Sequence, residues 1–491
     1  MSENTIRVRY APSPTGYQHI GGVRTALFNY LFARATGGKF ILRIEDTDQE
    51  RFTKDALEDI YTTFSWLGMD WDEGPDKEGP FAPYFQSQRT ELYKKHIMDL
   101  VDRGEAYYCY CSSERLEAMR EEQQKTKKGS GYDRRCRELS GVELEKAKAE
   151  NPNPVVRLKI PLNGETSFDD ILLGSVKRKN TDINPDPVIL KSDGFPTYHL
   201  ANVVDDHTME ITHILRAQEW VPSVPIHVIL YKAFGWEPPK FCHLPMVMGK
   251  DGQKLSKRHG STSLRDFKTE GYLKEAILNY IALLGWSFDD TREFFTLAEL
   301  EKLFTIDKLN KSASTFDYKK LEWFNGQYIR QKSKDEVKNL ILPYLKEDEK
   351  VAAVIDSDKG GEILDGVISL VHERLKLLKD VLPLTRFLFV DEVDFETEEL
   401  IPKKMDALAA IKICEKIKEL FGRFSDSDEE NEAFFRAAAD ELGVKLGDLL
   451  QPLRVAITGS KVSPPLFESL GLLGMEKCIK RLNKAIDQLK A

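Results

Sequence analysis

The sequence has 491 residues, of which 41% are apolar and 31% are charged, and its formal net charge is −9. This length and composition allow three or four globular domains with packed cores, and they exclude a disordered or fibrous chain. The longest apolar runs are far shorter than the ~20 residues that cross a bilayer, and no signal or transit pattern opens the sequence. We therefore expect a cytoplasmic protein without a membrane partner.

The first 44 residues predict a strand, an irregular loop, a helix and a second strand. Residues 6–10 are β-prone, whereas residues 11–22 contain two prolines and three glycines and cannot form regular structure. Apolar residues recur at helical spacing over 23–31, before a pair of glycines, and residues 40–44 form the next apolar run. A unit of this kind is the first piece of a parallel α/β sheet.

An interruption follows, from about residue 100 to residue 187. It contains clustered cysteines, glycine-rich loops and a charged segment, 113–128, that we predict to be helical. Strand-like apolar segments resume at 188–190, 211–215 and 241–248, with a predicted helix at 224–234 between the last two. A sheet that is interrupted and then resumed predicts one α/β fold with a domain inserted in its middle.

Beyond residue 262 the strand patterns fade and helical periodicity dominates. Examples are residues 363–381, 411–421 and 475–489. Two charge-rich stretches, 346–361 and 425–430, are predicted to be loops or boundaries. The carboxyl-terminal part is therefore expected to be all-α.

The loop before the first helix, residues 9–22, reads RYAPSPTGYQHIGG. Its histidine and last two glycines lie where a strand leads into a helix, and the free backbone N–H groups and the helix dipole there favour an anion. Gly21 and Gly22 would let a phosphate or an adenine approach the backbone, and His19 would donate to a phosphate oxygen. Taken alone, a proline-rich loop with one histidine is more often structural.

A second loop, residues 249–260, reads GKDGQKLSKRHG and follows an apolar strand. Four basic side chains lie between Lys254 and His259. A solvated basic loop is the simpler interpretation, and a mobile lid that carries ammonium groups to a triphosphate is the functional one. Basic clusters also occur at 125–137 and 177–179, and local clusters of this kind matter more to a nucleic acid than the negative net charge.

Together the two loops resemble the paired signatures of class I aminoacyl-tRNA synthetases. Residues 19–22, HIGG, resemble the first signature, with Gly22 where many relatives have a second histidine, and residues 254–258, KLSKR, resemble the second. Further segments look like bacterial-type glutamyl-tRNA synthetases in particular; these are residues 11–16, 43–48, 198–206, 216–220 and 321–325. The likeness runs from about residue 7 to residue 330 and is weaker beyond, apart from 456–459 and 466–474.

The resemblance implies an α/β fold of the Rossmann type with an inserted acceptor-binding domain, followed by an all-α anticodon-binding part. The implied segments are 1–103 and 187–261 for the two halves of the catalytic domain, 104–186 for the insertion, 262–330 for a helical stem-contact domain and 331–491 for the anticodon-binding region. It also implies a monomeric ligase that uses ATP and Mg²⁺ to form glutamyl-adenylate, with tRNA present, and then esterifies the 3′ end of tRNA(Glu).

Site residues follow from the same resemblance. The ATP-binding and catalytic set is Gly16, His19, Gly21, Gly22, Lys254, Lys257 and Arg258, and the glutamate-binding set is Arg9, Ser13, Glu45, Tyr198, Asn202 and Arg216. Arginine suits a substrate with two carboxylates because its guanidinium is planar, charged and bidentate. Arg9 is preferred for the side-chain carboxylate, although which arginine takes which end stays open. Without the family pattern, Glu45 would be interpreted as an exposed carboxylate paired with Arg43.

Three cysteines crowd the predicted insertion and suggest structural zinc, which prefers four tetrahedral ligands. They are Cys109, Cys111 and Cys136. Tyr132 is the preferred fourth ligand and Glu138 is the alternative. A cysteine pair separated by one residue is a weaker signal than two pairs separated by two, so three buried, metal-free cysteines are the competing interpretation.

Several rival functions share parts of this pattern. A tRNA-modifying glutamyl paralogue would lack the helical carboxyl-terminal half, and a glutaminyl-tRNA synthetase would differ around the first loop and at 43–48. A catalytically inactive tRNA-binding protein would have lost His19 or the lysines of residues 249–260, which we call the lysine loop. Neither is lost. A ligase that also charges tRNA(Gln) is left open.

Overall fold

The computed structural model describes residues 5–77, 79–127, 131–425 and 427–491. Lys128, at the end of the predicted charged helix, and Asp426, in the second predicted loop, lie outside the described residues. The chain divides into two compact units, one ending at Phe267 and taking in Ile277–Asp317, the other made of Lys268–Ala276 and Tyr318–Ala491.

The first unit begins with a strand–helix–strand motif. Helix α1 (Ile20–Thr36) connects strand β1 (Arg7–Tyr10) to strand β2 (Lys39–Leu42), and the two strands pair in parallel. The helix ends at Gly37, whose φ of 65° is a left-handed conformation that favours glycine. The elements predicted for the first 44 residues are confirmed, with slightly different ends.

A second strand–helix–strand motif completes the parallel core. Strands β8 (His213–Ala217) and β9 (Lys240–Leu244) pair in parallel, and helix α7 (Val224–Phe234) connects them. The backbone N–H of Thr212 donates to the carbonyl of Arg7 at 2.9 Å, and α1 contacts β1, β2 and β8, so the two motifs form one layered body. The predicted α/β fold is confirmed.

One predicted strand of this core belongs elsewhere. Residues Val188–Leu190 do form strand β7, but β7 pairs antiparallel with β4 (Val155–Leu158), which pairs with β3 (Ala106–Cys109). Its membership of the resumed parallel sheet is therefore wrong. A three-residue apolar run carries no information about its partner, and Ile189 is buried in a separate cluster with residues of α7.

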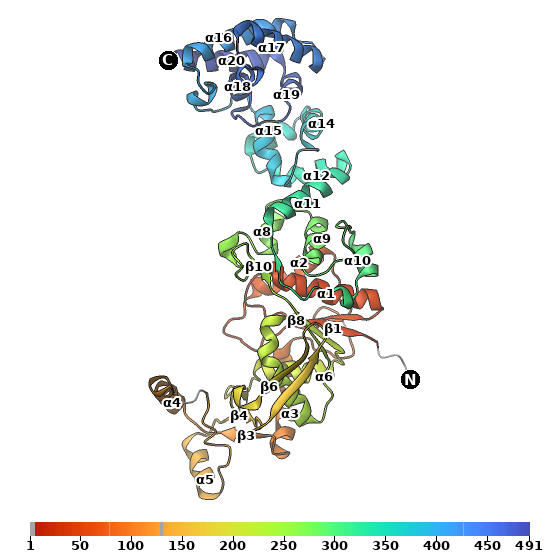
Figure 1. Cartoon of the computed structure of the whole chain (residues 1–491), viewed down its shortest axis with the longest axis vertical. Helices are drawn as coiled ribbons and strands as arrows, with labels where there is room; N and C mark the ends of the chain where they lie inside the picture. Colours follow the sequence, from red (N-terminus) through yellow and green to blue (C-terminus); the bar gives the residue numbers. More distant parts are fainter. Residues whose placement is uncertain (1–4, 78, 128–130, 426) are drawn as a thin grey trace. The chain divides into compact units, whose positions relative to one another are not determined.

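The interrupting segment also contributes to the core. Strands β5 (Glu165–Asp170) and β6 (Gly174–Lys179) form a hairpin, and the N–H of Ile171 donates to the carbonyl of Phe241 at 2.8 Å, next to the single β5–β9 pair between Asp170 and Phe241. The strand order of this sheet is β6-β5-β9-β8. By contrast, helices α4 (Ser113–Thr126) and α5 (Gly141–Glu150) bury no residue and lie at the edge of the unit (Figure 1).

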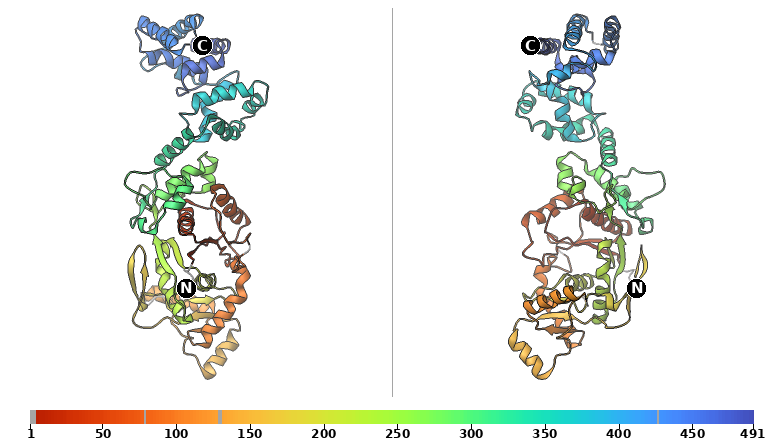
Figure 2. Two further views of the ribbon diagram at one scale, coloured as in Figure 1. Left: turned by 90° about the vertical axis from the view of Figure 1, so that its right-hand side faces the viewer. Right: turned by 60° about the vertical axis from the view of Figure 1, so that its left-hand side comes forward.

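The described residues of the second unit form helices and the turns that connect them (Figures 1 and 2). Two predicted helices match α16 (Ala407–Leu420) and α20 (Met475–Lys490). The helical run predicted at 363–381 is split between α14 (Gly360–Val371) and α15 (Val381–Phe389), and the loop predicted at 346–361 contains α13 (Glu349–Ile355). The side chain of Asp348 accepts from two backbone N–H groups of α13 and so starts a helix inside a charged segment.

The remaining elements complete the two units. They are helices α2 (Lys54–Leu67), α3 (Thr90–Asp102), α6 (Tyr198–Thr208), α8 (Leu264–Thr269), α9 (Lys274–Leu283), α10 (Leu297–Leu303), α11 (Tyr318–Gln331), α12 (Lys334–Leu345), α17 (Asp428–Leu442), α18 (Leu446–Thr458) and α19 (Leu466–Leu473), with short strands β10 (Val247–Met248) and β11 (Ser314–Thr315).

A buried arginine of α20 connects the ends of two other helices in the second unit. Arg481, on α20, is 2% exposed and donates to the carbonyls of Phe387 at 2.8 Å and Val390 at 2.5 Å, where α15 ends. It also donates to the carbonyl of Ile457 near the end of α18 and to that of Asp391 at 3.3 Å. Carbonyls at helix ends lack intrahelical partners, so this guanidinium satisfies several at once.

Arg481→Met should destabilise this unit, because the methionine keeps part of the apolar packing but leaves buried carbonyls without a donor. We expect the free energy of unfolding to fall by on the order of 3 kcal/mol, measured by urea unfolding followed by circular dichroism. Lys480→Met, at an exposed position of the same helix, is the matched control. Equal stability of the two variants would contradict this role for Arg481.

Candidate active site

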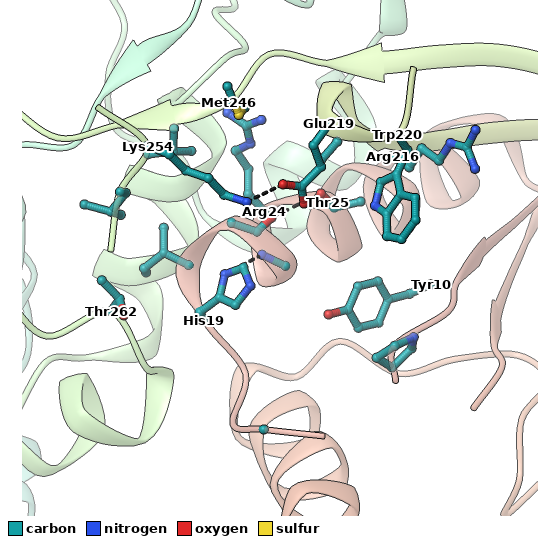
Figure 3. Close-up of a pocket in the computed structure, with 18 of the residues that line it drawn as sticks. Tyr10, His19, Arg24, Thr25, Arg216, Glu219, Trp220, Met246, Lys254 and Thr262 are labelled. Carbon is teal, nitrogen blue, oxygen red and sulfur yellow. Dashed lines mark hydrogen bonds and ion pairs between the residues drawn. The ribbon is translucent and has the colours of Figure 1, made fainter. Parts of the chain in front are cut away.

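A pocket of about 740 Å³ opens in the first unit. The end of β1, the loop after it and the start of α1 line one part, while β8 and residues 246–263 line another (Figure 3). The two loops that the sequence singled out therefore meet around one cavity, although more than two hundred positions of the chain separate them.

Most of the predicted site residues line this pocket. They are Arg9, Gly16, His19, Gly21, Gly22, Glu45, Tyr198, Asn202, Arg216, Lys254 and Lys257. Ser13 and Arg258 are not among its lining residues: Ser13 is exposed, and the Arg258 guanidinium lies 3.4 Å from the Asp251 carboxylate.

His19 is fixed by the start of α1. It is the N-cap residue, and its Nδ1 accepts from the backbone N–H of Gly22 at 3.2 Å, so Nε2 carries the ring proton. Burial and the nearby Lys254 ammonium lower the pKa of His19, against the opposing effect of Glu219. A Cβ at position 22 would lie 2.9 Å from the Tyr10 hydroxyl, which is one reason for glycine there.

The lysine loop is folded rather than extended. Met248 and Lys254 form an antiparallel bridge, and His259 Nδ1 accepts from the backbone N–H of Ser256 at 3.0 Å. The Lys254 ammonium pairs with the carboxylate of Glu219 at the pocket, and both side chains are partly exposed (Figure 3). Glu219 lies inside the segment 216–220 that carried the family likeness, yet its residue type alone did not indicate this pairing.

Arg9 lies in a buried ion-pair cluster. Its Nε and Nη2 donate to Asp206 at 3.0 and 3.2 Å, and Arg43 Nη1 donates to the same carboxylate at 2.7 Å. Burial disfavours the Asp206 carboxylate, but the two guanidiniums outweigh it and hold the pKa of Asp206 below its usual value. Asp206 ends the segment 198–206, but no local pattern indicated that its side chain would bind two arginines.

Glu45 is paired with Arg43 and also lines the pocket. Its Oε1 accepts from Arg43 at 3.1 Å, as the simpler interpretation expected. The side chain is nonetheless only 12% exposed and lines the pocket. Burial raises the pKa of Glu45 against the opposing effects of Arg43 and Arg9. A cationic group entering the pocket would favour the charged form.

Within the described part of the chain, the hydrogen-bond partners of Arg216 are neutral groups. Its Nη1 donates to the Tyr198 hydroxyl at 2.8 Å and its Nε to His243 Nε2 at 3.0 Å. Its Nη2 is buried without a partner among the described residues, and Arg216 as a whole is only 5% exposed. Tyr198 in turn packs on Trp220, with ring centroids 4.6 Å apart. A buried guanidinium with no carboxylate of its own favours an anionic ligand.

The three clustered cysteines converge in space. The Sγ atoms of Cys109, Cys111 and Cys136 lie within 4.8 Å of one another. The Tyr132 hydroxyl is 3.3 Å from Cys109 Sγ and 3.5 Å from Cys111 Sγ. The Glu138 side chain is 85% exposed and lies beside Arg137. Of the two candidate fourth ligands, Tyr132 therefore fits the cluster.

None of the helices within the described ranges has the length and apolarity needed to span a bilayer.

Comparisons with known proteins agree with this architecture. Residues 5–323 match the family model "tRNA synthetases class I (E and Q), catalytic domain", and residues 336–486 match an anticodon binding domain. A glutamate–tRNA ligase of Treponema denticola is 54% identical over 98% of this chain and 99% of its own, and one of Borreliella burgdorferi is 54% identical over 99% of both. A crystal structure of a glutamate tRNA ligase from Elizabethkingia meningosepticum in complex with its amino acid is 34% identical, with a TM-score of 0.82, covering 99% of this chain and 100% of that one.

Proposed function

The chain belongs to the bacterial glutamate–tRNA ligases, a family of class I aminoacyl-tRNA synthetases, and on this premise we propose how its own residues carry out the reaction. The single observation that supports the proposal most is the pocket in which His19, Lys257 and the two arginines Arg9 and Arg216 come together. The substrates are L-glutamate, ATP and tRNA(Glu), and we expect a monomeric, cytoplasmic enzyme.

Glutamate occupies the part of the pocket near the buried arginines. Arg216 offers an unpaired, buried N–H and carries a charge that none of its hydrogen-bond partners neutralises, so it binds one substrate carboxylate. Arg9 lies nearby with its charge shared with Asp206 and binds the other. Glu45 receives the ammonium group, and Asn202 and Tyr198 complete the polar lining. Glutamine is disfavoured because its amide would leave a buried guanidinium without an anion.

ATP occupies the part between the two loops. The α-carboxylate of glutamate attacks the α-phosphorus, forming glutamyl-adenylate and releasing pyrophosphate, and no general base is required because the nucleophile is already anionic. His19 Nε2–H and the Lys257 ammonium stabilise the charge that develops on the phosphates, with Lys254 in support. A ribose hydroxyl at the 3′ end of tRNA then attacks the activated carbonyl and releases AMP.

Mg²⁺ would accompany the ATP phosphates and neutralise part of their charge. Besides Glu45, the pocket lining includes two carboxylates, Glu219 and Asp266, of the kind that bind Mg²⁺ in proteins. Arg258 and Ser13, which lie outside the pocket lining, stay predictions without a role derived from this structure.

We also propose roles for the remaining segments. Residues 104–186 contact the acceptor stem of the tRNA. Residues 262–330 form a helical stem-contact domain, and residues 331–491 bind the anticodon. The match of residues 336–486 to an anticodon binding domain supports the last of these, and the helical content of that segment is consistent with it.

Structural zinc is proposed at the cysteine cluster. Thiolates bound at ~2.3 Å around a tetrahedral zinc lie ~3.8 Å apart, and Cys111 Sγ and Cys136 Sγ are already 3.5 Å apart. With Cys109 and the Tyr132 hydroxyl they supply four ligands, which would hold the exposed segment around α4 in place.

A charging assay tests the function directly. The purified protein should esterify radiolabelled glutamate to tRNA(Glu) in an ATP-dependent reaction, and tRNA(Gln) tested separately shows whether the second tRNA is also a substrate. Periodate oxidation of the terminal ribose should abolish charging, because the reacting hydroxyl is lost. Equal labelling of oxidised tRNA would instead indicate the base-modifying reaction.

Lys257→Ala should slow activation selectively, because the ammonium stabilises charge in the transition state. We expect the rate of ATP–pyrophosphate exchange, measured with tRNA(Glu) present, to fall roughly 10²–10³-fold. Lys250→Ala is the matched control, since Lys250 lies in the same loop but pairs with Asp317 at 3.2 Å and does not line the pocket. Exchange at the unmodified rate in Lys257→Ala would overturn the role of this lysine.

Elemental analysis tests the metal site. The purified protein should contain about one zinc per chain, because the cluster supplies one set of four ligands. Cys136→Ser should remove most of the zinc, whereas Glu138→Gln, the control, should retain it. A zinc-free preparation with full charging activity would exclude the proposed site.

A further inference from the structure

Three buried side chains form a line across neighbouring strands and end at Arg216. Arg216 on β8 and His243 on β9 are register partners in the parallel pair, so both side chains point to the same face. Asp170, at the end of β5, lies on the other side of β9. Asp170 Oδ2 is 2.6 Å from His243 Nδ1, and His243 Nε2 is 3.0 Å from Arg216 Nε.

The geometry fixes the protonation state of His243. The Nε of a guanidinium is a donor and never an acceptor, so His243 Nε2 must be the unprotonated, accepting nitrogen. The ring proton is therefore on Nδ1 and is donated to Asp170. Burial lowers the pKa of His243, Asp170 opposes this and the Arg216 charge reinforces it, with a net lowering. The imidazole is neutral between a carboxylate and a guanidinium.

This arrangement differs from the way Arg9, another arginine that lines the pocket, is held. Arg9 contacts the Asp206 carboxylate directly, and the two charges compensate each other. Arg216 is oriented by neutral groups, His243 and Tyr198, while the carboxylate of Asp170 lies behind the imidazole. The imidazole thus orients the guanidinium without placing an anion against it. Among the described residues, Nη2 has no hydrogen-bond partner and can donate to a ligand.

Asp170 is itself held firmly. Its Oδ1 accepts from the backbone N–H groups of Leu172 at 2.9 Å and Leu173 at 3.0 Å, and its Oδ2 accepts from the N–H of His243 at 3.1 Å. Both Asp170 and His243 side chains are 0% exposed. The turn of the β5–β6 hairpin therefore holds the Asp170 carboxylate in place beside Nδ1 of the imidazole.

We propose that Asp170 and His243 are positioning residues that act through Arg216: Asp170 selects the His243 tautomer whose Nε2 accepts from Arg216 Nε, and this fixes the guanidinium for a substrate carboxylate. The inference rests on the proposed glutamate site. Neither residue contacts substrate, so their loss should weaken glutamate binding and leave ATP binding unchanged.

Two substitutions of His243 separate this role from a purely structural one. In His243→Gln the amide oxygen reaches the place of Nε2 and still accepts from Arg216. In His243→Asn the shorter side chain places its amide nitrogen near the position of Nδ1, where it can donate to Asp170, and the amide does not reach Arg216. Loss of a hydrogen bond to a charged group should raise the KM for glutamate roughly 10- to 100-fold in His243→Asn, with the KM for ATP within about twofold of the unmodified value.

The measurement is ATP–pyrophosphate exchange with tRNA(Glu) present, with glutamate and ATP varied separately. His243→Gln should recover most of the glutamate affinity. His213→Asn is the matched control, because His213 is a buried histidine of β8 that does not line the pocket, and its KM values should not change. A glutamate KM unchanged in folded His243→Asn, equal rises for both substrates, or equal effects of the two His243 variants would each overturn the inference.

Asp170→Asn provides a second variant if His243→Asn fails to fold. An amide N–H facing Nδ1 favours the opposite tautomer, which directs Nε2–H at the Arg216 N–H, so the KM for glutamate should again rise selectively. Unchanged glutamate affinity in this variant would contradict the role of Asp170. Absence of glutamate-dependent exchange in the unmodified protein would refute the proposed function itself, which distinguishes that failure from a failure of this inference.

Discussion

Buried guanidinium groups need partners, and Arg9 and Arg216, two of the arginines that line this pocket, have partners of different charge. Arg43 and Arg9 share the carboxylate of Asp206 in a buried ion-pair cluster. Arg216 is held by the neutral groups of His243 and Tyr198. An unpaired buried charge is costly, so this guanidinium favours an anionic ligand in the way proposed above.

The two signature loops were recognisable because their backbone requirements are local. His19 caps the first helix with its own side chain, and the glycines after it leave room for Tyr10 and the imidazole. In the lysine loop, His259 is locked by Ser256 and Asp251. Residue types that satisfy such short-range geometry are visible in a sequence, and this is why the pocket was predictable from two short segments.

What the sequence could not supply was long-range pairing. The order β6-β5-β9-β8 brings Asp170, His243 and Arg216 into line, and no local pattern encodes the register of strands so far apart in the chain. The same reason explains why β7 was predicted in the wrong sheet. The prediction of a loop at residues 346–361 was wrong for another reason. A single capping carboxylate, Asp348, starts a helix within a stretch whose charge suggested a loop.

The ion pair between Lys254 and Glu219 connects the loop at residues 249–260 to the segment that follows β8. Because both side chains are about half exposed, water and counterions weaken their attraction, and such pairs contribute about 0–1 kcal/mol. Separating this carboxylate from the ammonium therefore costs little free energy. Screening over a Debye length of ~8 Å at physiological ionic strength loosens the pair further. The Lys254–Glu219 pair is thus more sensitive to ionic strength than the buried ion pairs of Asp206 with Arg9 and Arg43.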